Sequence, residues 1–364
     1  MKKQPLKPLR FTPEGAFTIL HITDTQERFL SSTIIQEFIY DLAKKEKPAL
    51  AVLTGDNVRG GKHVNWLPKP LALWFMRRSV DSLMRVFDRI YRRFGIPMTM
   101  VYGNHDNEIG PCKVSKAEQF AMYAAHRCFV GQYSPEADEG TGAADRQGRH
   151  YGTHKLVIQD KTGAKPAFCL WMFDSGSWDN RGGDSCVEGP QIAWFERNHA
   201  ALGRLPSFVF QHVVVPEACD FTPGGALPAG TRGALCGPLQ RNPHNEGLYG
   251  ALCGAGNVLA LFAGHDHGNS YELRLPGPDL VATPAAGYLH RGRGEMRGAR
   301  VITLDEKNLS DYQTQAITYE AFYPDNRLRR ARMRLFRKKG AAATPLDIFT
   351  FKPLLRLLGR FGNY

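Results

Sequence analysis

The sequence predicts an α/β fold in which a partly parallel sheet is covered by helices. Over residues 17 to 102, apolar runs typical of buried strands alternate with longer segments of helical periodicity. Hydrophobic residues make up 43% of the 364 residues, which is enough for a substantial core. Because a β-α-β-α-β alternation favours parallel strands joined by helical crossovers, we expect the helices to lie against the faces of the sheet.

The first half of the chain supplies three strands and two helices. The helix Ile34 to Lys45 carries an apolar stripe at helical spacing after a Ser-Ser-Thr segment that is typical of a helix start. The segment Trp66 to Phe94 has apolar residues near helical spacing with arginines between them. The strands are expected at Phe17 to Thr23, Ala49 to Thr54 and Ile96 to Tyr102.

The second half predicts further helices and strands separated by two long loops. Helices are expected at Ser115 to Cys128 and Gln191 to Leu202. Strands are expected at Tyr151 to Gln159, Ala167 to Phe173, Phe208 to Gln211 and Val258 to Ala263, with a second sheet formed by Ser270 to Leu275, Leu280 to Thr283 and Ala299 to Leu304. The glycine-rich segments Gly131 to His150 and Pro216 to Gly247 are predicted to be loops that are either functional, deciding the substrate, or disordered, since loops of this length are uncommon in compact domains.

The positive charge is concentrated in the C-terminal segment. Residues 327 to 364 carry eleven Lys or Arg and one acid, a net charge of +10, whereas the whole chain carries +12 and residues 1 to 326 therefore +2. Arg327 to Lys339 mixes basic and apolar residues, as do segments that lie on anionic membranes or nucleic acid. The alternative is a tail that packs its apolar residues on the body and leaves its charges in water.

Several classes of protein are excluded by the composition. The N-terminal segment lacks the apolar stretch of a secretory signal, and no run approaches the roughly 18 apolar residues of a spanning helix. The seven cysteines are odd in number and contain no C-x-x-C pair, which argues against a disulfide framework or a thiolate zinc site. We therefore expect a cytoplasmic protein, peripheral to the membrane if the tail binds lipid.

Five apolar runs each end in residues with carboxylate, amide or imidazole side chains, which are the types that can bind metals. In chain order these endings are Asp24-Thr25-Gln26, Gly55-Asp56-Asn57, Gly103-Asn104-His105-Asp106, His212 and Gly264-His265-Asp266-His267. Open α/β sheets place their sites at such strand ends. Taken singly, each of these residues is more typical of a turn or of a satisfied core histidine. Together they predict one metal site.

In this order and with these separations, the five segments resemble the calcineurin-like metallophosphoesterase superfamily, over residues 17 to 304. The resemblance implies a four-layer α/β/β/α sandwich of two mixed sheets flanked by helices, as one domain over residues 14 to 326 with a basic tail over 327 to 364. Further segments resemble its purple-acid-phosphatase-like fungal and plant branch, namely Asp174-Ser175-Gly176, Gln191 to Phe195, Asn245 to Leu248, Gly287-Tyr288 and Arg297 to Ile302.

The resemblance also implies a role for each motif residue at a centre of two metal ions, manganese or iron, with zinc as a further option. Asp24 and His267 would bind the first ion, Asp56 would bridge, and Asn104, His212 and His265 would bind the second. A metal-bridging hydroxide would attack the phosphate ester while His105 protonates the leaving oxygen and Asp106 orients His105.

Gln26 departs from the family pattern, which most often has His at this position. Its neutral amide oxygen is a weaker ligand than imidazole, so Gln26 would ligate weakly, contact a metal-bound water, or leave the first site dependent on metal supply. Asp56-Asn57-Val58-Arg59 also lacks the tyrosine that purple acid phosphatases carry three residues after the bridging Asp, so no purple ferric chromophore is expected.

The function expected first is hydrolysis of a phosphomonoester carried by a small molecule or a phosphoprotein. A phosphodiesterase or pyrophosphohydrolase acting on a nucleotide or lipid head group is the alternative within enzymes. The alternative of another class is a catalytically weak binding protein that works through its basic tail, on an anionic membrane surface rather than on nucleic acid. Lesser candidates for gripping phosphate are Arg59, His63, Arg181 and His244, and Trp178 is a candidate wall of the pocket.

Overall fold

The computed structural model describes residues 6–27, 33–59, 67–106, 115–132, 134, 137, 152–176, 185–239, 244–287 and 294–326. Several sequence-based expectations lie outside these ranges and stay predictions. They are the basic tail, most of the loop Gly131 to His150, and the residues His63, Trp178, Arg181 and Tyr288.

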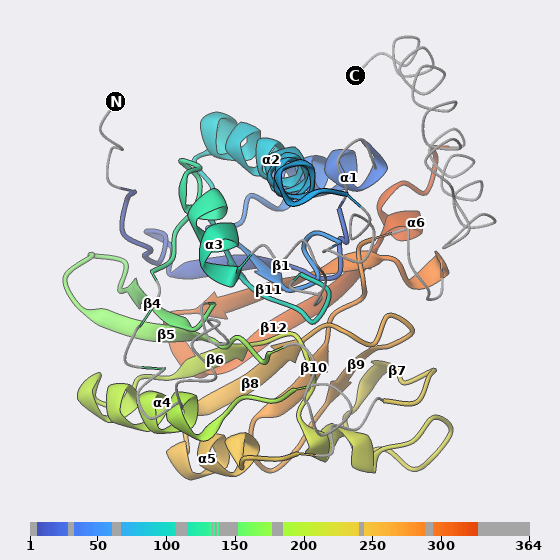
Figure 1. Ribbon diagram of the computed structural model, residues 1–364. Helices are drawn as coiled ribbons and strands as arrows, with labels where there is room; N and C mark the ends of the chain where they lie inside the picture. The colour runs from blue at the N-terminus through green and yellow to red at the C-terminus, as the bar shows by residue number, and fades with distance from the viewer. Residues whose placement is uncertain are drawn as a thin grey trace.

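Two mixed sheets form the centre of the molecule (Figure 1). The five-stranded sheet has the order β12-β11-β1-β2-β3. Strands β1, β2 and β3 are parallel to one another, and β11 pairs antiparallel with both of its neighbours, β1 and β12. Its strands are β1 (Ala16–Ile22), β2 (Leu50–Thr54), β3 (Met98–Val101), β11 (Gly298–Asp305) and β12 (Asn308–Thr318).

The seven-stranded sheet has the order β4-β5-β6-β8-β10-β9-β7. Strands β5, β6, β8 and β10 are parallel, and β4, β9 and β7 complete the sheet with antiparallel pairing. The strands are β4 (His154–Gln159), β5 (Pro166–Met172), β6 (Ser207–Phe210), β7 (Arg232–Ala234), β8 (Val258–Ala263), β9 (Ser270–Leu273) and β10 (Asp279–Ala282).

Helices cover the outer face of each sheet, so the predicted four-layer α/β/β/α sandwich is confirmed (Figure 1). Three helices lie on the five-stranded sheet and two on the seven-stranded sheet, whereas a short helix follows β12 and packs on α1. The helices are α1 (Thr33–Glu46), α2 (Lys69–Phe94), α3 (Lys116–Ala124), α4 (Gly189–Ala201), α5 (Leu248–Ala255) and α6 (Tyr319–Phe322), and 3₁₀ turns occur at Pro216–Asp220 and Gly294–Met296.

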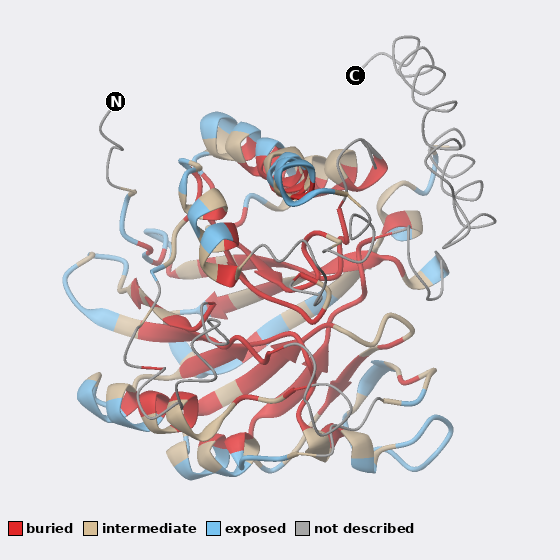
Figure 2. Ribbon diagram, viewed as in Figure 1, coloured by how far each residue is buried: buried red, intermediate tan, exposed pale blue. Residues whose placement is uncertain are grey.

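Three hydrophobic clusters separate the four layers, as the buried strands in Figure 2 indicate. The middle cluster lies between the two sheets and includes Phe17 of β1, Phe210 of β6 and Phe262 of β8. Leu9 and Phe11, which precede the predicted domain start at residue 14, are also buried in this cluster. The two sheets are therefore joined over a continuous apolar surface.

The expected grouping of the last three strands is wrong in one respect. Segment Ala299 to Leu304 belongs to β11, which pairs antiparallel with β1 in the five-stranded sheet. Only β9 and β10 join the other sheet, together with the motif strands β6 and β8. The sequence pattern gave each strand its place in the chain, but partners almost 300 residues apart leave no local signal. None of the described helices is long and apolar enough to cross a membrane.

Candidate metal centre

The five motif loops meet at one edge of the sandwich, and both sheets contribute to it. The loops after β1, β2 and β3 carry Asp24, Asp56 and Asn104, while the loops after β6 and β8 carry His212 and His265. The side chains of Asp24, Asp56, Asn104 and His212 are at most 3% exposed. Buried carboxylates that face one another require compensating positive charge.

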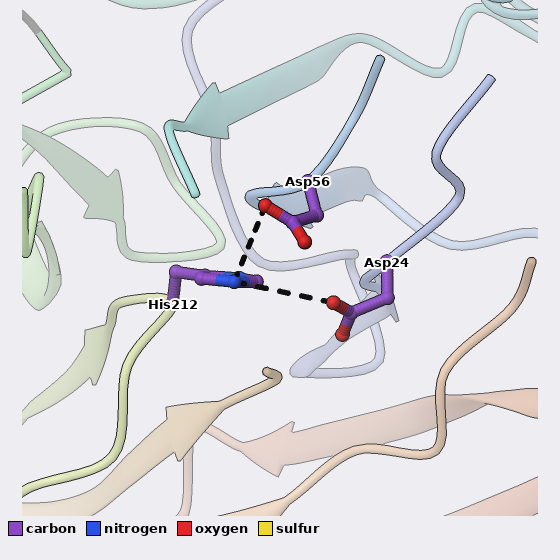
Figure 3. A group of neighbouring side chains, drawn as sticks. All are labelled: Asp24, Asp56 and His212. Atoms are coloured by element: carbon purple, nitrogen blue, oxygen red, sulfur yellow. Dashed lines mark ion pairs between the residues drawn. The ribbon is translucent and has the colours of Figure 1, made fainter. Parts of the chain in front are cut away.

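Asp24, Asp56 and His212 form a group of three mutually close ligand atoms (Figure 3). One ligand atom of each lies within 4.8 Å of the others. The Nε2 atom of His212 is 3.4 Å from Asp56 Oδ1 and 4.0 Å from Asp24 Oδ1. Its other ring nitrogen, Nδ1, lies 2.8 Å from the carbonyl oxygen of Thr54, which fixes the imidazole so that Nε2 points into the cluster.

Two further predicted ligands complete the histidine side of the cluster. His267 Nε2 lies 3.1 Å from Asp24 Oδ1. The ring of His265 stands edge-on to the His212 ring at a centroid distance of 5.1 Å, and its backbone N–H donates to Asp24 Oδ2 at 3.0 Å. Asn104 Oδ1 lies 3.1 Å from His212 Nε2. The structure therefore brings together the predicted ligands from all five motifs.

Gln26 contacts the predicted bridging residue through its amide nitrogen. Its Nε2 donates to Asp56 Oδ2 at 3.0 Å. A carboxylate oxygen accepts only from the NH₂ end of an amide, so the orientation of the Gln26 amide follows from its partner. Gln26 Oε1 is then buried without a hydrogen-bond partner among the described residues. A buried amide oxygen without a partner, on a residue that contacts the Asp56 carboxylate, fits the role of a neutral metal ligand.

The backbone around the cluster adopts conformations that L-residues rarely take. Six described non-glycine residues have positive φ, and four of them are Asp24, Gln26, Asp56 and His265, with φ of 53°, 42°, 48° and 73°. Such conformations cost free energy and persist where the surroundings hold them, most often at functional sites. The β1 and β2 loops hold each other here, because Asp24 N–H donates to Gly55 O and Gln26 N–H to Asp56 O.

The motif glycines are required because the loops approach each other closely. A Cβ atom on Gly103 would lie 2.3 Å from both the backbone nitrogen and Oδ1 of Asp56. A Cβ on Gly264 would lie 1.9 Å from Thr23 Oγ1 and 2.7 Å from Asp24 Oδ2. Neither position accepts a side chain without displacing a predicted ligand.

His105 occupies the exposed side of the cluster. Its imidazole Nε2 lies 3.9 Å from Asp56 Oδ2 and its side chain is 25% exposed. The His105 backbone N–H donates to Asp56 Oδ1 at 2.8 Å, which fixes this residue relative to the predicted bridging carboxylate. The imidazole is thus accessible to a ligand from solvent, as a proton donor to a substrate must be.

Asp106 lies beneath the loops and binds their backbone. Its carboxylate accepts hydrogen bonds from the N–H groups of Gly103, Asn57 and Val58 at 2.8, 3.3 and 2.9 Å. Burial, together with the charge of Asp56, raises the pKa of Asp106 to about 7. The geometry assigns Asp106 to joining the β2 and β3 loops, and the orientation of His105 by Asp106 stays a prediction.

Sequence reasoning missed a buried brace beneath the central motif. Lys116 Nζ, at the start of α3, lies 2.5 Å from Asp174 Oδ2, and the two side chains are 2% and 0% exposed. Tyr102 OH donates to the Lys116 carbonyl, and Gln119 Nε2 donates to the Asp106 carbonyl. Asp174 was noted only as part of a family segment, and a lysine in the first turn of a helix gives no signal of burial.

The donor set suits a pair of metal ions. Carboxylate, amide oxygen and imidazole are the ligands of hard and borderline divalent ions, and two-metal hydrolases need a carboxylate that can contact both. Asp56 lies between His212 on one side and Gln26 on the other. Arg59 and His244 lie within the described chain, but their role in gripping phosphate stays a prediction.

Comparison with known proteins yields one family and several relatives. The family model described as calcineurin-like phosphoesterase matches residues 17–269. "Probable inactive purple acid phosphatase 28" and "Probable inactive purple acid phosphatase 14" of Arabidopsis thaliana are each 25% identical, over 337 and 339 residues, covering 83% of this chain and 78% of theirs. "Phosphatase DCR2" of Saccharomyces cerevisiae is 23% identical over 73% of this chain and 46% of its own. The crystal structure of a dimetal phosphatase from Danio rerio is 13% identical in sequence, and the match covers 83% of this chain and 99% of that chain with a TM-score of 0.49.

Proposed function

Because this chain belongs to the calcineurin-like phosphoesterase family, we propose that it hydrolyses phosphate monoesters at the cluster of Asp24, Asp56 and His212. The observation that carries the proposal is the convergence of two buried carboxylates and an imidazole within 4.8 Å, at the family's motif positions. The carboxylates of Asp24 and Asp56 repel each other at this distance, and the cluster itself contains no lysine or arginine. A bound cation would therefore stabilise them.

Two metal ions, manganese or iron with zinc as the alternative, are proposed to bind here. Asp24, His267 and Gln26 would hold the first, Asn104, His212 and His265 the second, and Asp56 both. When bound, such ions neutralise the negative charge of a phosphate ester and lower the pKa of water. The supporting observations are the orphan Oε1 of Gln26 and the orientation of His212, whose Nδ1 is engaged by Thr54 while its Nε2 faces Asp24, Asp56 and Asn104.

The residues of the chain would then bind, orient and protonate the substrate. His105 is proposed to donate a proton to the leaving oxygen, because its ring is partly exposed next to Asp56. Its backbone bond to Asp56 fixes the distance between the proton donor and the centre. Asp106 supports this geometry by tying the β2 and β3 loops together through three backbone N–H groups.

One observation favours a second candidate, a binding protein with little catalytic activity. Gln26 replaces the histidine of the family pattern, and the amide nitrogen that it presents to Asp56 cannot ligate a metal. The Arabidopsis relatives are also named as probable inactive phosphatases. In this alternative the centre holds fewer than two ions and the protein acts by binding alone.

The test combines elemental analysis with turnover of model substrates. Purified protein is assayed for bound metal and for hydrolysis of para-nitrophenyl phosphate and its bis-ester, with manganese, iron, zinc or nickel supplied. We expect about two ions per chain and faster hydrolysis of the monoester. Faster hydrolysis of the bis-ester would instead support the phosphodiesterase. No bound metal and no turnover with any ion would support the binding protein.

Variants connect the activity to the cluster. Asp56→Asn is expected to lower kcat/KM by on the order of 1,000-fold, since metal-assisted charge stabilisation contributes several kcal/mol. His105→Asn should lower kcat by about 100-fold or more while two ions stay bound. Asp311→Asn, on the exposed surface of β12, is the matched control and should leave both values unchanged. Full activity in Asp56→Asn and His105→Asn would refute the assignment.

A further inference from the structure

We propose that the solvent-facing side of α2 is a docking surface for an anionic lipid bilayer. This helix of 26 residues carries seven Lys or Arg and two Asp, a net charge of +5. All of residues 1 to 326 together carry only +2, so the remainder of the body is net negative. The positive charge of the folded part is therefore concentrated on one helix.

The charges lie on one face of α2 and the apolar residues on the other. The inner face is buried against the five-stranded sheet and includes Val80, Leu83 and Phe87. The outer face presents a row of exposed residues at spacings of three, four or seven, which places them along one line of the helix. This row, called here the cationic stripe, consists of Leu71, Trp74, Arg78, Arg85, Arg89 and Arg92.

The two acids of α2, Asp81 and Asp88, lie at the edge of the stripe, three residues after Arg78 and Arg85, and both pair with His126. His126, just beyond α3, places Nδ1 at 2.7 Å from Asp88 Oδ2 and Nε2 at 3.6 Å from Asp81 Oδ1. Both carboxylates are partly buried, with 27% and 32% of the side chain exposed. The exposed charged residues of α2 along the stripe are therefore all arginines, and Figure 2 shows that the outer side of this helix is exposed.

Exposed apolar side chains at the start of the stripe favour a bilayer over nucleic acid. Leu71 and Trp74 are 49% and 43% exposed, and they are two of the three large exposed hydrophobic residues in the described chain. The Arg78 guanidinium lies over the Trp74 ring, 5.6 Å from its centre. Tryptophan and leucine beside arginine are typical of helices that lie in the lipid headgroup region, with the apolar side chains among the acyl chains.

The last described residues before the basic tail lie in the same helical layer as α2. The last described residues follow α6, which packs on α1 through Phe38 and Phe322 at a ring distance of 5.6 Å. Tyr323 OH donates to Asp41 of α1 at 2.6 Å. The described chain therefore ends close to α1, the helix that packs against α2, and the segment that follows in the sequence carries a net charge of +10. A second cationic segment strengthens membrane binding, since two weak membrane signals give stable binding where one does not.

The experiment measures vesicle binding by the full-length protein and does not depend on catalysis. Protein is sedimented with vesicles of phosphatidylcholine alone or with about 20% phosphatidylserine. We expect binding to the anionic vesicles only, weakened by salt. The variant R78E/R85E/R89E should lower the apparent affinity at least about tenfold. The matched control K161E/K165E/K307E changes the net charge equally, on the β4–β5 and β11–β12 hairpins, and should bind as the wild type does.

A second variant tests the apolar contact. L71S/W74S should also weaken binding to anionic vesicles, and the loss of Trp74 should abolish the blue shift of tryptophan fluorescence that we expect on vesicle addition. Circular dichroism and thermal midpoints establish that each variant is folded. Unchanged vesicle binding by R78E/R85E/R89E would overturn the proposal. Binding of duplex DNA that this variant loses, without vesicle binding by the wild type, would also overturn it.

Discussion

The two sheets contribute different chemistry to the metal centre. Asp24, Gln26, Asp56 and Asn104 follow strands of the five-stranded sheet, and all of them offer oxygen atoms. The histidines follow strands of the seven-stranded sheet and offer imidazole nitrogens, namely His212, His265 and His267. Each sheet supplies only part of the proposed ligand set, which is complete where the two sheets pack together.

The two halves also differ in how they are held. The oxygen side is almost completely buried, and three of its residues have positive φ, fixed by backbone bonds between neighbouring loops. On the nitrogen side, His267 is 16% exposed and His265 is partly exposed. Burial therefore distinguishes His265 and His267 from the oxygen ligands, whereas His212 is as buried as those ligands are.

Polar links between the sheets supplement the apolar middle cluster. Two buried ion pairs cross between the two halves, Lys116 with Asp174 and Arg300 with Glu272. Two buried histidines also cross, since His21 lies between Thr54 and Thr283, and His154 of β4 bonds to Thr99 of β3. Substitutions at these links can weaken the contact between the two sheets without changing a predicted ligand.

The largest effect is expected from breaking the Lys116 pair. Lys116→Met leaves the Asp174 carboxylate buried without its cation, which should lower the free energy of unfolding by about 3–5 kcal/mol. Denaturant titration measures the loss. The double variant K116M/D174L removes both charges and should recover most of it, because a matched apolar pair has no desolvation cost.

A surface ion pair is the control for that experiment. Lys45 is 66% exposed beside Glu46 at 3.8 Å, and Lys45→Met should change the free energy of unfolding by at most about 1 kcal/mol. A loss in Lys116→Met no larger than this value would show that the link between the sheets does not depend on the buried pair. Failure of the double variant to recover stability would assign the loss to packing.

A substitution at Gln26 can give the oxygen side of the site a nitrogen ligand like those on the histidine side. Gln26→His adds a nitrogen donor to the oxygen side and should raise the affinity for zinc or iron by about 10- to 100-fold. Elemental analysis after dialysis against graded chelator measures the affinity. Gln26→Leu, which has a similar size but no amide, should retain one ion in place of two. Equal metal retention in all three proteins would show that residue 26 does not contact an ion.

The sequence predicted the parts of the site but not its division between two sheets. Each ligand follows an apolar run, and such local patterns identify strand ends reliably. The pairing of β11 with β1 joins residues as distant as Ala16 and Asp305, and no local pattern encodes it. Lys116 was missed for a related reason. Its burial depends on Asp174, which reaches it from the other half of the fold.

The smallest effect concerns His21, whose neutral ring links the two halves in the interior. Burial, with a smaller contribution from Arg300, lowers the pKa of His21 to about 3 from the usual 6.5, and burial lowers the pKa of His154 to about 4. As the pH falls below about 6.5, the unfolded chain takes up protons on both histidines and the folded chain does not. The free energy of unfolding therefore decreases by about 1.4 kcal/mol per pH unit for each histidine. Above about pH 6.5 neither histidine contributes to the pH dependence of the free energy of unfolding.

Urea unfolding between pH 7 and about 5 tests this linkage, and because Asp106, with a pKa of about 7, titrates there in every variant, the difference between the slopes isolates the histidine. His21→Asn keeps a polar group near Thr54 and Thr283 but cannot take up the proton, so its pH slope should be smaller than the wild-type slope by about 1.4 kcal/mol per unit. H21N/H154N should lose about twice as much of the slope. The slope, not the absolute stability, carries the result, since any packing defect of Asn is the same at each pH. A wild-type slope in His21→Asn would mean that His21 has the same pKa in the folded and the unfolded chain.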